Sequence, residues 1–95
     1  MAEFLHISFY FKGKAKIDEL KPEFDKALDW YRYAPNCWIV WTTTDSEGWY
    51  ARLKPLISDD DSMLIIPFKY EPLSGFASKA MWDFFKAHVE KKDEK

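Results

Sequence analysis

The sequence predicts an α+β domain with a four-stranded sheet. Across its 95 residues, four short β-rich runs alternate with segments in which apolar residues recur every three or four positions. A period of two residues is typical of strands, and a period near 3.6 is typical of amphipathic helices. The densest run, residues 37–43, is rich in aromatic and β-branched side chains and lies between turn signals, so it predicts a buried central strand.

Residues 4–11 predict the first strand, because apolar and more polar side chains alternate there. One face carries Leu5, Ile7, Phe9 and Phe11, and the other carries Phe4, His6, Ser8 and Tyr10. An apolar helical stripe follows in residues 17–28, with Asp18 as its expected N-cap. Pro22 would then lie inside the helix, so a start at Pro22 itself is the competing interpretation.

Residues 30–33 and the central strand predict a hairpin around the turn at residues 34–36. Asp45 or Ser46 is expected to cap a second helix, which Pro55 closes. The inner face of this helix carries Trp49, Leu53 and Leu56. Residues 63–66 predict a fourth strand ended by Pro67. Ser78 is expected to cap a last helix, with an apolar stripe of Met81, Trp82, Phe85 and Val89.

This order is a split βαβ pair, which predicts a ferredoxin-like βαββαβ fold with an antiparallel sheet and two helices on one face. Residues 1–95 form one domain with an extra C-terminal helix, and residues 89–95 are a charged tail expected to fray. The sheet face bearing Phe4, His6, Ser8 and Tyr10 is left without a cover. We therefore expect these residues to form the interface of a homodimer, with the last helix as the competing cover.

Composition excludes several classes of protein. The net charge of −2 is not that of a protein that coats nucleic acid. The single cysteine, Cys37, excludes an internal disulfide. No apolar run reaches the roughly 18 residues of a membrane span, and the N-terminus lacks the pattern of a signal peptide. We expect a soluble cytoplasmic protein without membrane attachment.

Several stretches resemble a known family in their order and spacing. They are residues 30–33 (WYRY), 37–40 (CWIV), 52–55 (RLKP), 60–62 (DDS) and 80–85 (AMWDFF). The chain resembles the ferredoxin-like proteins related to the second CRISPR adaptation protein and the virulence-associated D toxins, above all the SinR-like branch. The resemblance implies a homodimer formed through the sheets. Catalytic members cut RNA or duplex DNA with metal help, and others hold DNA without nuclease activity.

The resemblance also implies an aspartate at the end of the first strand in catalytic members, where a pair of them holds a divalent cation across the dimer axis. In this chain Tyr10 stands at that position, and a shift by one residue finds only Phe9 or Phe11. With no carboxylate available, we expect a non-catalytic interaction or nucleic-acid-associated module without metal or cofactor.

Three other features remain candidates for function. His6 and Tyr10 share a strand face, and together they suggest a toxin-type ribonuclease that works without metal. Exposed aromatic side chains suggest instead an adaptor that binds another protein. A small basic patch for DNA or RNA is expected from Lys12, Lys14, Lys16 and Arg32. The acidic run at residues 59–61 lacks the spacing of a calcium loop, so it is expected to be solvated.

Overall fold

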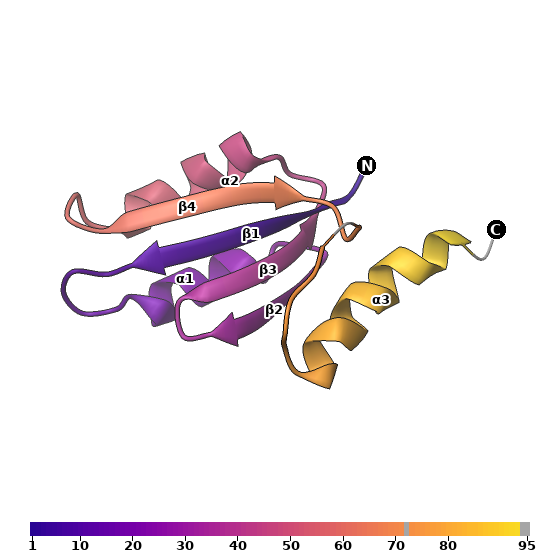
Figure 1. Ribbon diagram of the computed structural model, residues 1–95. Coiled ribbons are helices and arrows are strands. Elements are labelled where there is room, and N and C mark those ends of the chain that lie inside the picture. Colours follow the sequence, from indigo (N-terminus) through magenta and orange to yellow (C-terminus); the bar gives the residue numbers. More distant parts are fainter. Residues whose placement is uncertain (72, 94–95) are drawn as a thin grey trace.

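A computed structural model describes residues 1–71 and 73–93, with side chains as far as residue 89. Strands and helices follow one another in the order that the sequence predicts, and the last helix extends to Asp93 (Figure 1). The elements are β1 (Glu3–Tyr10), α1 (Ile17–Phe24), β2 (Asp29–Ala34), β3 (Cys37–Thr42), α2 (Ser46–Leu53), the 3₁₀ turn η1 (Lys54–Leu56), β4 (Ser62–Phe68) and α3 (Lys79–Asp93). Residues 94–95, the end of the tail expected to fray, lie outside the described residues.

The four strands form one antiparallel sheet in the order β2-β3-β1-β4. This order is that of two interleaved βαβ units, so the predicted α+β, ferredoxin-like fold is confirmed. β1 and β3 are the inner strands, and Ile7 of β1 lies opposite Trp38 of β3 on one side and Ile65 of β4 on the other. The aromatic run at residues 37–42 is therefore surrounded by pairing partners, as its composition predicts.

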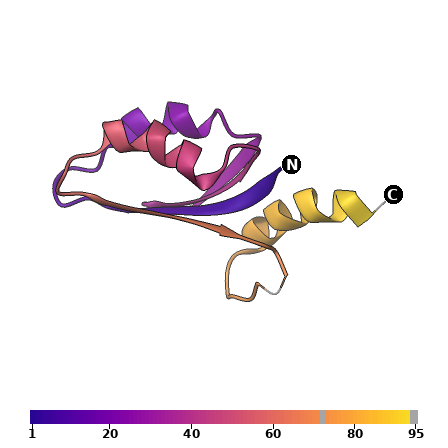
Figure 2. The same ribbon diagram turned by 90° about the horizontal axis from the view of Figure 1, so that it is seen from above.

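Helices α1 and α2 cover one face of the sheet, as Figure 2 shows from above. The main core lies between them and the sheet, where Phe24 of α1 stacks on Trp38 with ring centroids 4.4 Å apart. Trp49 of α2 is buried beside them, and its indole N–H donates a hydrogen bond of 3.1 Å to the buried hydroxyl of Thr42. The strand face bearing Leu5, Ile7, Phe9 and Phe11 is thus the covered one, as expected.

Two prolines, Pro22 and Pro67, lie inside a helix and a strand that were expected to begin or end at them. β4 continues through Pro67, which lies opposite Leu5, so the expected end of the strand at Pro67 is wrong. β4 is an edge strand, where a proline without an N–H is tolerated. α1 begins at Ile17, with Pro22 inside it, and Lys16 rather than Asp18 is its N-cap residue. The predicted cap of α2 is confirmed, since the Asp45 carboxylate accepts a 2.8 Å hydrogen bond from the N–H of Gly48.

The second sheet face is covered at one end by α3. A second apolar cluster forms there from Phe4, Ile39 and Phe85, with further rings packed around them. Polar contacts fasten α3 to the edge strand β2: His88 lies 2.8 Å from the Asp29 carboxylate, and the hydroxyls of Tyr31 and Ser78 lie 3.4 Å apart. Among the helices as far as they are described, none is long and apolar enough to cross a membrane.

Candidate functional site

The other end of this second face carries two exposed large side chains, Tyr10 and Leu64, and we call them, together with the half-buried Ser8 between them, the open patch. Strand register explains the grouping. Ser8 lies opposite Leu64, and residues directly opposite in an antiparallel pair point to the same face about 5 Å apart. Tyr10 is 64% exposed and Leu64 58%. Ile66 of β4 lies outside the patch, because it shares the lining of a groove with Met81 and Trp82 of α3. The chain thus leaves large apolar groups in solvent where α3 does not reach.

The expected interface residues divide between the two ends of the face. Phe4 is buried beneath α3, stacked on Phe68 and edge-on to Phe85, so the chain itself covers it in this arrangement. Tyr10 lies at the opposite end and is exposed. Ser8 and His6 lie between these ends and are partly buried. The competing cover, the last helix, therefore accounts for the end of the face that bears Phe4.

His6 has a close partner, and it is Tyr33 rather than Tyr10. The Nε2 atom of His6 lies 2.5 Å from the Tyr33 hydroxyl, with ring centroids 5.6 Å apart. Tyr10 lies four residues from His6 along the strand, about 13 Å away. An irregularity in β2 between Arg32 and Ala34 falls at Tyr33. A bulge of this kind re-aims a side chain, and a sequence pattern does not reveal it.

Burial sets the charge state of this pair. It lowers the pKa of His6, because the charged imidazolium is disfavoured away from water. It also raises the pKa of Tyr33, and the neighbouring Cys37 side chain raises it further. Both groups are therefore neutral at pH 7. The pair can donate or accept a hydrogen bond, but no contact on the described chain shows it activating a nucleophile or holding a phosphate.

The four predicted basic residues do not form one positive surface. The Lys16 ammonium lies 3.2 Å from the Asp61 carboxylate and donates to the Ser58 hydroxyl at 2.7 Å. Lys12 and Lys14 line the same hollow, which also carries the acidic residues Asp18, Glu19, Asp60 and Asp61. The Arg32 guanidinium is turned instead toward its own hairpin, where it donates to the Pro35 carbonyl oxygen at 2.7 and 3.0 Å.

The acidic run was expected to be solvated, which holds for Asp59 and Asp60 but is wrong for Asp61. The Asp61 side chain is only 3% exposed and accepts hydrogen bonds from the backbone N–H groups of Ser58 and Lys12, which join two loops at one end of the sheet. The Ser58 bond is the largest cause of its lowered pKa, with Lys12 and Lys16 adding to it. Asp59 lies 3.6 Å from Lys54. Within the described ranges, no three His, Cys, Asp or Glu residues gather as metal ligands.

Comparisons with known proteins give no family to which the chain can be assigned. No family model, no curated protein and no solved structure matches it.

Proposed function

We propose that this chain is a non-catalytic interaction module that forms a homodimer through the open patch. The observation that carries the proposal is the cluster of exposed apolar side chains on the uncovered end of the sheet, above all Tyr10 and Leu64. Clustered apolar side chains exposed on a protein surface mark interaction sites far more often than single ones do. The resemblance to dimeric CRISPR adaptation proteins also supports a homodimer.

A second copy is the simplest occupant of such a surface. A two-fold axis through the patch would bring the same residues of both copies together, so one set of side chains supplies both halves of the interface. Tyr10 is well suited to this position, because a tyrosine buries apolar area while its hydroxyl can remain hydrogen-bonded to water at the edge of the interface. The interface would centre on Tyr10 and Leu64, and Phe4 would contribute only indirectly by holding α3 in place.

Protein contact is favoured over nucleic-acid contact by the charges of the described surface. The carboxylate of Asp61 pairs with Lys16, and further acids share the hollow with Lys12 and Lys14. Binding to a phosphate backbone depends on free lysine and arginine side chains. Weak, salt-sensitive binding of DNA or RNA would be secondary to the dimer.

Light scattering on the purified chain at about 100 µM tests the proposal. We expect a mass of twice the 11.3 kDa of one chain. Leu64→Arg should reduce this mass to that of one chain, because an isologous interface would bring two like charges together. Tyr50→Arg is the matched control, since Tyr50 is also exposed but lies on α2 at the other side of the sheet. A wild-type mass of one chain would refute the dimer.

A further inference from the structure

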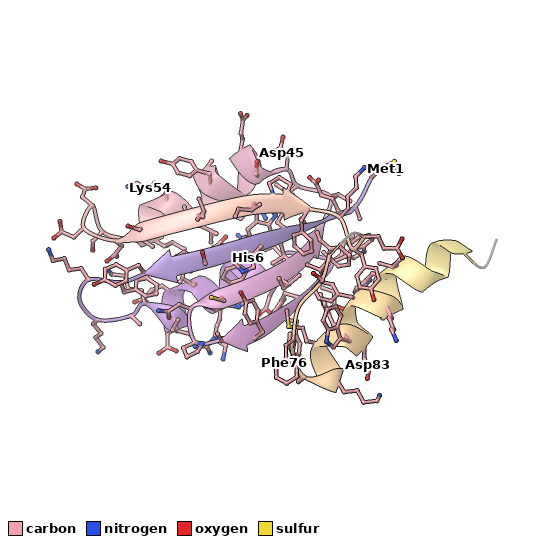
Figure 3. The ribbon with its side chains drawn as sticks, in the orientation of Figure 1. Met1, His6, Asp45, Lys54, Phe76 and Asp83 are labelled. Carbon is pink, nitrogen blue, oxygen red and sulfur yellow. The ribbon has the colours of Figure 1, made fainter. Side chains whose placement is uncertain are left out.

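A groove runs between the second sheet face and the segment that leads to α3. Its volume is about 370 Å³, which lies in the range of small-molecule sites. Ile39 and Ile66 of the sheet form its floor, Met81 and Trp82 of α3 line one side, and connector residues 73–77 line the other. Figure 3 shows His6 near the middle of the sheet and Phe76 on the connector beside the start of α3. The groove is thus made by three separate segments of the chain.

The polarity of the groove is uneven. None of the described residues that line it is a lysine, arginine, aspartate or glutamate, and most are aliphatic or aromatic. His6 and Tyr33 place an imidazole and a phenol in this apolar lining. The Nε2 atom of the imidazole and the hydroxyl oxygen of the phenol lie 2.5 Å apart. An apolar channel with a few placed polar groups is the usual form of a site that fixes the orientation of a small ligand.

We propose that this groove binds a small uncharged molecule with an apolar body and one hydroxyl head group, an alcohol or a phenol. The body would lie between Ile66 and Trp82, and the hydroxyl would reach the His6–Tyr33 pair. This site is distinct from the proposed dimer, because Tyr10 and Leu64 do not line the groove.

The hydroxyl head follows from the hydrogen-bonding chemistry of the pair. If Tyr33 donates to Nε2 of His6, the phenol oxygen remains free to accept; if Nε2–H donates, the phenol O–H remains free to donate. A hydroxyl group satisfies either arrangement. A carboxylate would be held without a cationic partner, which is unfavourable in an apolar site. The lowered pKa of His6 supports this, because His6 supplies no positive charge at pH 7.

The test is an NMR titration of the full chain at pH 7 with 2-naphthol and with 2-naphthoate, which share a ring system and differ in their head group. We expect saturable amide shifts at Ile66, Phe76 and Trp82 with 2-naphthol, and at least tenfold weaker binding of 2-naphthoate. Equal affinity for the two probes, or no saturable shifts in the groove with 2-naphthol, would overturn the proposal.

Variants separate this site from the dimer. Tyr33→Phe keeps the ring and removes the hydroxyl, so it should weaken 2-naphthol by about two- to tenfold. Ile66→Arg should abolish binding, because it places a charge on the groove floor. Leu64→Arg lies on the same face outside the groove and should bind 2-naphthol as the wild type does, even if it no longer dimerises. Unchanged binding by Tyr33→Phe would refute the role given to the pair.

Discussion

Replacing Phe85 by alanine tests whether α3 is part of the folded domain. Phe85 is 1% exposed and has five aromatic rings around it, with centroids 5.2 to 6.0 Å away in Phe4, Phe68, Tyr70, Trp82 and Phe84. Losing a buried phenylalanine side chain and leaving a cavity costs about 3–5 kcal/mol. Tight aromatic packing limits collapse of the cavity, so we expect a loss near the upper part of that range.

Equilibrium urea unfolding followed by circular dichroism measures this loss. A domain of this size has a free energy of unfolding of roughly 5–14 kcal/mol, so a loss of this size removes a third or more of the stability and should clearly lower the urea midpoint. Phe76→Ala is the matched control: it is the same substitution at a fully exposed residue, so it should change stability by less than about 0.5 kcal/mol. If Phe85→Ala cost no more than Phe76→Ala, then α3 would not be packed on the sheet.

Three further outcomes are expected. Purified protein should cleave neither RNA nor duplex DNA, with or without Mg²⁺, in a gel assay; metal-free cleavage that disappears in His6→Ala would instead establish the ribonuclease alternative. Thr42→Val should lower the free energy of unfolding by about 1–3 kcal/mol, because it leaves the buried indole N–H of Trp49 unpaired. The pKa of Asp61 is lowered in the folded chain, chiefly by the Ser58 N–H, so its contribution to stability is present above about pH 4 and is lost as the pH falls through the folded pKa. Unfolding experiments between pH 2 and 7 should show this loss in the wild type and a smaller one in Asp61→Asn.

Much of the fold could be predicted because it is encoded locally. Alternation in β1 identifies the face that carries Leu5 and Ile7, and Asp45 marks the start of α2 three residues before the N–H it caps. The role of Pro67 could not be predicted in this way. Whether a proline ends a strand depends on whether that strand lies at the edge of the sheet, and the edge position of β4 follows from the order of all four strands.

The candidate site was predictable only in part. His6 stands out in the sequence as a histidine on a largely apolar strand, but its partner Tyr33 comes from the edge strand β2, which β3 separates from β1. Similarly, Lys16 and Asp61 are 45 positions apart, so nothing near either residue indicates that the two charges pair. Local patterns identify the groups that carry chemistry, whereas the charge and hydrogen bonding of those groups depend on the tertiary fold.

Because α3 covers one end of the second sheet face and leaves the other in solvent, substitutions at the two ends should change different properties, stability at one end and association at the other. Phe85 lies at the covered end, so its substitution should change stability, while Leu64 lies at the uncovered end and should change association. If Phe85→Ala also increased the molecular mass beyond that of the wild type, then release of α3 would itself expose a surface for association. Stability and mass measured on both variants therefore show whether the two ends of the face act independently or whether α3 limits assembly.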